Sequence, residues 1–294
     1  MDGEKPAVMW LHHIGGSHGR AATILERFID ATTDVPRLHS LEGYSSYELS
    51  DHLANFIRVQ SLLKEYSPDS LYYFCLGIQW YLHACGRVGN IFFHDTFMDC
   101  RKLLNQFALK FIGSYYDDPI YISTCVSEKY LWESDHLSPK WPHTLLWTVV
   151  YLVMKYFKLS TVEEHKALKM KNLFKRETRD RVKGKQSYFF YFLQESRGTQ
   201  YCKRQLLPDK NPSRCPVEIM KIYLSKCPRL PKMRDSCLYL KPISRCDLES
   251  QPYWFTQEEL PDKDLAEMLN RFKMVSEITE LFVKDRITSL IPWY

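Results

Sequence analysis

The amino-acid sequence predicts an α+β protein that is mostly α-helical, with an all-helical first part and a mixed second part. Apolar residues recur at helical spacing over 46–113, and short aromatic or β-prone stretches follow from 186 onward. The composition, 45% hydrophobic and 26% charged, is typical of a chain with a packed core. Together with a count of only 11 glycines, it excludes collagen-like and wholly disordered proteins.

Residues 1–45 carry weak patterns and are expected to be a poorly defined N-terminal segment. Within them, GGSHGR (15–20) lacks the spacing and the lysine of a phosphate-binding loop, so a turn is favoured there.

Three or four amphipathic helices are expected to form a small bundle over 46–114, and three of them are bounded by residues that start or stop helices. Their boundaries are Ser46 and Pro68, Pro68 and Gly86, and Asp95 and Gly113. The run YYDDP (115–119) is expected to link this bundle to the second part.

The second part is expected to form a mixed domain over 120–283, followed by a tail at 284–294. Thr161 with Glu164 three residues later is a capping box, which predicts a short helix over 161–170. Other helices are expected over 127–134, 142–158, 215–227 and 262–282, and strands over 186–193, 200–206, 236–241 and 252–256.

Cysteine usage and the lack of an apolar leader indicate an intracellular protein. Nine cysteines are scattered without a CxxC pair, which is typical of buried, reduced thiols rather than a disulfide framework or a zinc site. The longest uncharged apolar stretch, Leu145 to Met154, is far shorter than the ~20 residues of a membrane span. We therefore expect no membrane association, no metal or other cofactor, and no small-molecule substrate.

The net charge of +5 hides a strong asymmetry along the chain. Residues 1–165 hold 14 basic and 19 acidic groups, residues 166–245 hold 21 and 6, and residues 246–294 hold 5 and 10. The successive net charges are −5, +15 and −5. Such a basic block predicts a polyanionic partner, although a solvated loop or a nuclear-import signal would give the same composition. The candidate nucleic-acid-binding residues are Lys166, Lys169, Lys171, Lys175, Arg176, Arg179, Arg181, Lys183 and Lys185.

Four sequence blocks occur in an order that resembles a known family. They are PDSLYYFCLGIQWYL (68–82), LLWTVVYLVMKYFKLSTVEEHKALKM (145–170), NPSRCPVEIMKIYLSKCP (211–228), and YWFTQEEL with MLNRFKMVSEI (253–260 and 268–278). Together they are similar to the C-terminal domain shared by the MYM-type zinc-finger proteins and the glutamine-rich protein family. That domain resembles the tyrosine recombinases of crypton transposons. The resemblance implies a helical core-binding-like domain followed by a degenerate recombinase-like α+β domain.

The residues of a working recombinase are not all present. Such an enzyme clamps the scissile phosphate with two arginines and attacks it with a tyrosine, with lysine and histidine assisting. The resemblance places the first arginine at Ser160, and serine cannot form the bidentate phosphate clamp. No histidine follows His165 in the sequence, and Tyr294 is expected to be a tail residue rather than a nucleophile. The sequence therefore predicts a protein that is not an enzyme.

We expect a non-catalytic, transposon-recombinase-derived module of a nuclear transcription or chromatin regulator. We expect this module to act as a scaffold for nuclear or chromatin proteins. As a further role, it is expected to contact DNA without sequence preference. An active DNA strand-transfer enzyme is the alternative. The aromatic strip Tyr188 to Phe192 supports a role in protein interaction, because one face of that strand should be core and the other needs cover from a helix or a partner.

Overall fold

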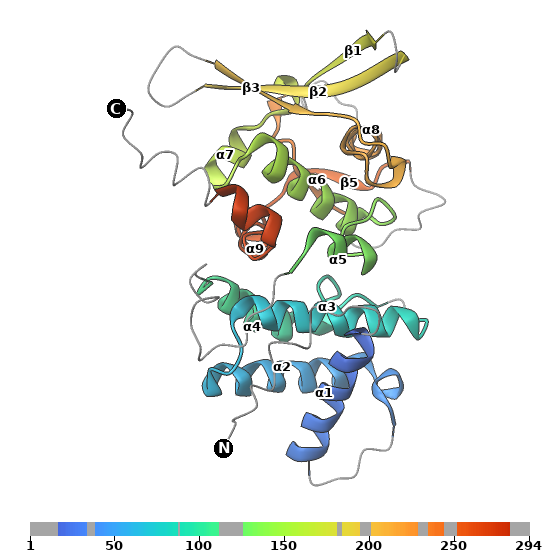
Figure 1. The fold of residues 1–294 in the computed structure, drawn as a ribbon, viewed down its shortest axis with the longest axis vertical. Helices are drawn as coiled ribbons and strands as arrows, with labels where there is room; N and C mark the ends of the chain where they lie inside the picture. The colour runs from blue at the N-terminus through green and yellow to red at the C-terminus, as the bar shows by residue number, and fades with distance from the viewer. Residues whose placement is uncertain are drawn as a thin grey trace, which may run out of the picture. The chain divides into compact units, whose positions relative to one another are not determined.

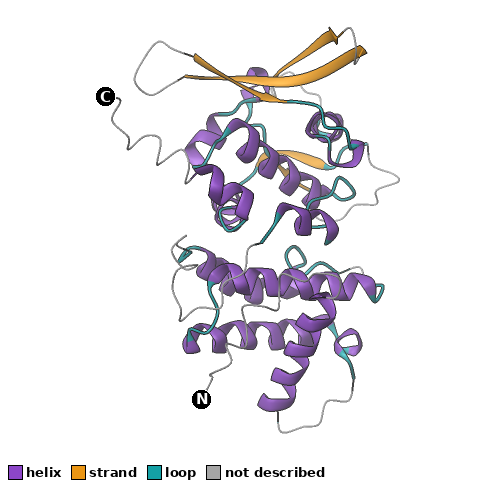
Figure 2. Cartoon of the chain, in the orientation of Figure 1, coloured by secondary structure: helices purple, strands orange, loops and turns teal. Residues whose placement is uncertain are grey.

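The structure of the protein is a computed structural model, which describes residues 17–33, 39–87, 89–111, 126–180, 184–194, 201–228, 235–243 and 252–282. The chain divides into two compact units. Unit 1 comprises Met1–Asp135 and Lys273–Glu280, and unit 2 comprises His136–Phe272 and Leu281–Tyr294. The structure is mostly helical with small antiparallel sheets, which confirms the predicted fold class (Figures 1 and 2).

Unit 1 is built from helices whose ends follow local sequence signals. Its helices are α1 (Ser17–Thr32), α2 (Ser46–Leu63), α3 (Pro68–Ala84), α4 (Met98–Ala108) and α5 (Glu128–Glu133). Ser45 and Glu48 form a capping box at the start of α2, and Lys64 ends that helix in the left-handed conformation. Pro68 occupies the first turn of α3, where its missing N–H costs no hydrogen bond.

Aromatic packing around α3 forms the core of unit 1. The rings of Phe56 and Phe74 stack with centroids 4.4 Å apart, and Phe28 of α1 meets Phe56 edge-on at 5.1 Å. On another face of α3, Tyr73 stacks on Tyr130 of α5 at 4.5 Å. Because α3 packs against several helices, 13 of its 17 residues are buried.

The chain returns to unit 1 near its C-terminal end. Val275 forms a parallel bridge with Val126, and the Ser276 N–H donates to the Val126 carbonyl at 2.8 Å. The Glu277 carboxylate also accepts a hydrogen bond from the Glu128 N–H at 2.9 Å. These contacts join two segments that lie far apart in sequence.

Unit 2 is organised around α6 (Pro142–Phe157), which is buried over most of its surface. This burial accounts for the uncharged run within α6. None of the helices in the described part of the chain is long and apolar enough to cross a bilayer. Trp147 and Tyr151 of α6 contact the Phe272 ring edge-on at 4.9 and 5.2 Å. The other helices of unit 2 are α7 (Val162–Ala167), α8 (Pro216–Lys226) and α9 (Asp262–Phe272).

Two antiparallel sheets complete unit 2. The larger has the order β1-β2-β3, formed by β1 (Phe174–Asp180), β2 (Gly184–Gln194) and β3 (Tyr201–Leu206). The smaller pairs β4 (Leu240–Pro242) with β5 (Phe255–Glu259). Figure 1 shows α6 running beneath one face of the larger sheet, and no helix or strand of the described residues covers the opposite face.

Several expected elements differ from the observed ones. The structure has α1 where no element was predicted and β1 where only a charged run was seen. The helix expected over 161–170 ends at Ala167. The strand expected over 236–241 is shorter and lies later, at Leu240–Pro242. The helix expected over 262–282 is interrupted at 273–275, because Val275 leaves the helical path to pair with Val126.

The buried thiols expected from the sequence are found at five of the six cysteines whose surroundings are described, and Cys85 is exposed. The linker predicted at 115–119 lies outside the described residues, so the predicted boundary between the two parts stays a prediction. Tyr294 and the tail 284–294 also lie outside them.

Candidate nucleic-acid interface

The turn before α7 carries the position that the family resemblance assigns to a phosphate-clamping arginine. Thr161 and Glu164 form the predicted capping box. The Glu164 carboxylate accepts hydrogen bonds from the Ser160 N–H at 2.7 Å and the Thr161 N–H at 3.1 Å. The Ser160 hydroxyl lies 3.4 Å from the same carboxylate oxygen. This corner therefore presents a carboxylate to its surroundings, and its backbone donors are already satisfied.

His165 is a fully buried residue of α7. Its Nε2 lies 3.0 Å from the Leu159 carbonyl, and its Nδ1 lies 2.7 Å from the Tyr239 hydroxyl. Because a carbonyl can only accept, Nε2 carries the proton and Nδ1 accepts from Tyr239. Burial lowers the pKa of His165 to about 4, so the imidazole is neutral at pH 7. Both ring nitrogens are occupied by bonds that hold α7 in place.

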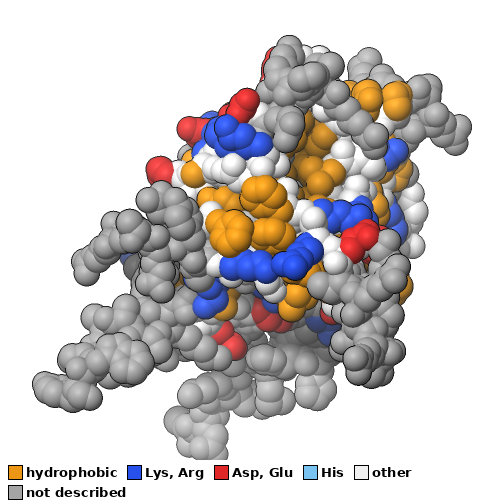
Figure 3. Space-filling view, turned by 90° about the horizontal axis from the view of Figure 1, so that it is seen from above, with side chains coloured by type: hydrophobic (Ala, Val, Ile, Leu, Met, Phe, Trp, Pro, Cys, Tyr) orange, Lys and Arg blue, Asp and Glu red, His pale blue; other side chains and the backbone are white. Residues whose placement is uncertain are grey.

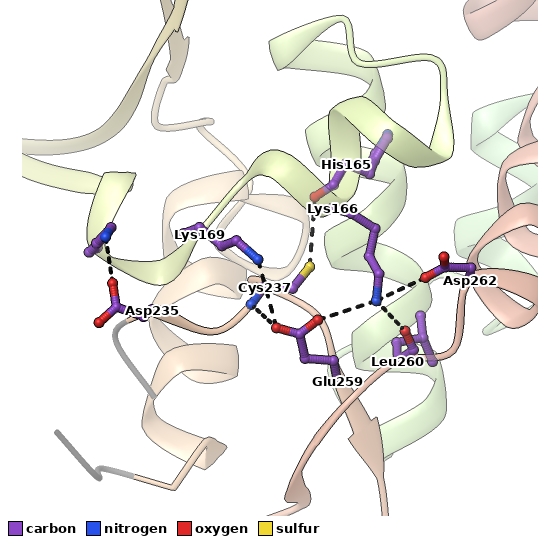
Figure 4. Close-up of polar contacts among 9 residues, drawn as sticks. His165, Lys166, Lys169, Asp235, Cys237, Glu259, Leu260 and Asp262 are labelled. Atoms are coloured by element: carbon purple, nitrogen blue, oxygen red, sulfur yellow. Dashed lines mark hydrogen bonds and ion pairs between the residues drawn. The ribbon is translucent and has the colours of Figure 1, made fainter. Parts of the chain in front are cut away.

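Lys166 joins α7 to the segment between β5 and α9 (Figure 4). Its ammonium donates to the Leu260 carbonyl at 2.9 Å and lies 3.1 Å from the Asp262 carboxylate and 3.4 Å from that of Glu259. The Lys166 side chain is only 23% exposed. Burial opposes its charge, but these carboxylates outweigh burial and raise the pKa of Lys166.

The Glu259 carboxylate also contacts a second lysine and a backbone N–H. Lys169 lies 3.8 Å from it, and the Cys237 N–H donates to it at 2.6 Å. Burial opposes ionisation of Glu259, yet the Cys237 N–H and the two lysines together lower its pKa. Lys166 and Lys169 are therefore part of a local network that neutralises their charge.

The other basic candidates are distributed over β1 and β2 and the turn before them. Lys171 is paired with Asp235, and Lys175 lies 3.4 Å from Glu177. Arg176 is exposed on β1. For Arg179 and Lys185 the structure describes the backbone alone, which pairs them across β1 and β2, and Arg181 and Lys183 lie outside the described residues. Among the five candidates whose side chains the structure describes, the four lysines lie beside carboxylates and Arg176 is exposed.

The aromatic strip on β2 has two faces, as the alternation of side chains in a strand requires. Phe189 and Tyr191 are buried on the face that covers α6, where the Tyr191 ring stacks on Phe157 at 6.0 Å. Leu206 of β3 pairs with Phe189 and is also buried. This face is the core side predicted from the sequence.

The opposite side of the sheet carries a group of exposed rings that we call the aromatic face. Phe190 stacks on Phe174 at 5.3 Å and meets Phe192 edge-on at 5.4 Å. The exposed fractions of Phe174 and Phe192 are 45% and 46%. The aromatic face consists of Phe174, Arg176, Tyr188, Phe190, Phe192, Lys203 and Gln205, which strand pairing places on one side.

A cation lies directly over the rings of this face. The Lys203 ammonium lies 4.7 Å from the Phe190 ring centroid and 5.1 Å from that of Tyr188, both within cation–π distance. Figure 3 shows hydrophobic side chains gathered in the middle of this side of unit 2, with Lys and Arg side chains beside them. The sequence pattern predicted the rings of β2 but not the placement of Phe174 and Lys203 beside them. The period-two placement of Phe174 and Arg176 in FKRETRD was the available signal, and it was weak because the stretch contains one apolar residue.

Two family models match this chain. The model described as "Domain of unknown function (DUF3504)" matches residues 122–274, and the QRICH1 domain model matches residues 33–111. The first match covers more than half of the chain. The chain belongs to the DUF3504 domain family.

Curated relatives of this DUF3504 chain include MYM-type and glutamine-rich proteins, which confirms the resemblance seen in the sequence. The chain is 34% identical over 254 residues to Zinc finger MYM-type protein 3 of Mus musculus, covering 80% of this chain and 18% of that protein. It is 31% identical over 269 residues to Zinc finger MYM-type protein 2 of Homo sapiens, covering 85% and 19%. It is 29% identical over 236 residues to Transcriptional regulator QRICH1 of Mus musculus, covering 76% and 30%.

The chain spans about a fifth of the length of these MYM-type relatives and less than a third of QRICH1. No solved structure is significantly similar to it.

Proposed function

We propose that this chain is a non-catalytic module of a nuclear transcription or chromatin regulator, derived from a transposon recombinase. It works as a scaffold for nuclear proteins and contacts nucleic acid without sequence preference. The curated relatives of this chain support the regulatory part, because they are named as a transcriptional regulator and as zinc-finger proteins.

The corner at Ser160 carries the non-catalytic part of the proposal. Phosphoryl transfer needs preorganised cations and donors aimed at the scissile phosphate. Here the Glu164 carboxylate lies 2.7 Å from the Ser160 nitrogen and takes the donors that would face a phosphate. A carboxylate in that position repels a phosphate instead of binding it.

The basic middle of the chain supports nucleic-acid contact, but through fewer residues than its composition suggests. Lys166 and Lys169 are engaged with Glu259. The contact is therefore expected at Arg176 and at the more exposed lysines Lys171 and Lys175, where surface pairing is weak and a phosphate can compete with it.

Covalent trapping on nicked suicide DNA substrates tests the absence of strand transfer. We expect no protein–DNA adduct under conditions in which an active tyrosine recombinase gives one. An adduct that disappears in a Tyr294→Phe variant, or in a variant of another tyrosine, would overturn the non-catalytic assignment.

Tethering tests the regulatory role. The chain, fused to an unrelated DNA-binding domain, is directed to a promoter that drives a reporter gene. We expect reporter output to differ from that of the DNA-binding domain alone, and to be unaffected by Tyr294→Phe. Equal output from the fusion and the domain alone, with both present in the nucleus, would contradict the proposal.

A further inference from the structure

The aromatic face has the chemistry of a binding surface rather than that of a core edge. Four rings lie side by side on an open sheet, and two of them, Phe174 and Phe192, keep nearly half of their area exposed. Single exposed apolar residues are common on protein surfaces, whereas a contiguous group of exposed rings marks an interaction site.

The charged side chains that the structure describes beside the rings are both cations. Lys203 lies over Phe190 and Tyr188, and Arg176 lies opposite Tyr188 in the strand pairing. Among the side chains that the structure describes on this face, none is a carboxylate. Glu177 points to the other side of β1, where it pairs with Lys175. The occupant should therefore be anionic and rich in flat, apolar surface.

Single-stranded nucleic acid combines these two properties in a regular repeat. Its bases have exposed π-faces that stack on aromatic side chains, and its phosphates pair with Lys and Arg. Tyr188, Phe190 and Phe192 alternate along β2, so successive rings are separated by about 6.6 Å of strand, roughly twice the ~3.4 Å rise between stacked bases. An open antiparallel sheet with aromatics on its central strand is also the surface on which RNA-recognition modules stack bases.

A duplex and a protein fit this surface less well. In a duplex the bases stack on one another, so the four rings would contact only the backbone and would contribute little. An apolar protein segment could cover the rings, but the charged side chains described on this face, Arg176 and Lys203, are both cations. A protein partner would have to supply carboxylates in matching positions.

We propose that the aromatic face binds single-stranded nucleic acid, with bases stacked on the exposed rings Phe174 and Phe192 and phosphates held by Lys203 and Arg176. This inference deepens the nucleic-acid contact of the proposed function by assigning its ligand and its residues. It is independent of the regulatory role, because tethering to a promoter does not require this chain to bind nucleic acid by itself.

Fluorescence anisotropy with the full chain and a labelled oligothymidine of about 16 nucleotides tests the proposal, with the corresponding duplex as a competitor. We expect the single strand to bind more tightly than the duplex. Phe192→Ala and Phe174→Ala should each weaken binding by roughly five- to 150-fold, the loss that corresponds to one base–ring stack. Phe192→Trp keeps an aromatic ring at this position and should therefore bind with unchanged affinity.

The salt dependence separates stacking from charge. Removal of one phosphate contact from a single strand reduces the slope of log affinity against log salt by about 0.7. Lys203→Gln should therefore reduce the slope by about that amount, whereas Phe192→Ala should lower the affinity without changing the slope.

Two matched variants serve as controls. Trp141→Ala removes a ring of similar exposure, 47%, at the start of α6, and Lys241→Gln removes a surface cation on β4. Both should bind like the unaltered chain, and circular dichroism should show that every variant keeps its fold.

Three results would overturn the proposal. One is the absence of single-strand binding at low salt. Another is equal binding of duplex and single strand with no effect of the phenylalanine variants, which would indicate electrostatic contact alone. The third is loss of a nuclear protein partner in Phe192→Ala with unchanged oligonucleotide affinity, which would assign the face to a protein. Failure of the proposed function would be seen separately, as a covalent protein–DNA adduct or as a tethered fusion that leaves reporter output unchanged.

Discussion

The Lys166 ammonium lies 3.1 Å from the Asp262 carboxylate, in contact with a segment that begins far downstream in the sequence. Lys166 also donates to the Leu260 carbonyl, so the lysine holds α7 against the start of α9. A cation counted from the sequence as part of a nucleic-acid surface is therefore a structural contact between two elements.

Lys166→Met should lower the free energy of unfolding by about 1–2 kcal/mol, because the Leu260 carbonyl loses its donor and Glu259 loses a partner. Lys241→Met, which removes a more exposed ion pair with Glu258, should change it by no more than about 0.5 kcal/mol. Urea denaturation measures both. Equal losses in the two variants would mean that the Lys166 network contributes no more than a surface pair.

The capping box before α7 predicts an order of stabilities. Thr161→Ala should cost about 1 kcal/mol through loss of the cap to the Glu164 N–H. Glu164→Gln should cost less than Glu164→Ala, because glutamine keeps an acceptor for the Ser160 and Thr161 N–H groups. Thermal unfolding gives the order, and a Glu164→Gln variant no more stable than Glu164→Ala would contradict it.

The stability of the chain should fall in mild acid because His165 is held neutral. Burial lowers its pKa to about 4 in the folded protein, whereas an unfolded histidine has a pKa near 6.5. Between these values the unfolded chain binds the extra proton, so stability is complete above about pH 6.5 and is lost as the pH falls toward 4. His136, whose pKa burial lowers to about 3, acts in the same direction.

Urea denaturation across this pH range measures the effect, which should be on the order of 3 kcal/mol for His165. His39→Gln alters an exposed histidine and is the control. A His165→Gln variant should be less stable at pH 7 but should lose less stability on acidification. The same loss in that variant as in the unaltered chain would show that His165 does not contribute.

The two faces of β2 should respond differently to truncation of neighbouring rings. Phe189→Ala should cost about 3–5 kcal/mol, because the ring is buried between the sheet and the helices below it. Phe192→Ala should change the free energy of unfolding by no more than about 0.5 kcal/mol, because the ring is half exposed. Chemical denaturation of the two variants checks this difference, and a large loss in Phe192→Ala would indicate that the aromatic face is part of the core.

Local signals predicted most of the helices and the split of the aromatic strip. Pro68, the Thr161–Glu164 pair and the apolar run of α6 act over a few residues, and the structure follows them. The N-terminal helix α1 was missed although Ala22, Leu25 and Ile29 repeat at helical spacing and are buried.

What the sequence could not predict depends on contacts between distant segments. The break after Phe272 arises because Val275 pairs with Val126, which no local pattern encodes. Which lysines form ion pairs within the fold also depends on distant segments, because Lys166 and Lys169 meet Glu259 only after folding. A count of charges along the chain therefore overstates the positive surface and does not locate Lys203 over the rings.

The return of residues 273–280 to unit 1 makes that unit discontinuous along the chain. During synthesis, domains generally fold from the N-terminus as they emerge from the ribosome. Unit 1 cannot do so completely, because the strand partner of Val126 and the acceptor for the Glu128 N–H are made only after all of His136–Phe272. A truncation after Phe272 would thus remove the part of the helical unit that pairs with Val126 and Glu128.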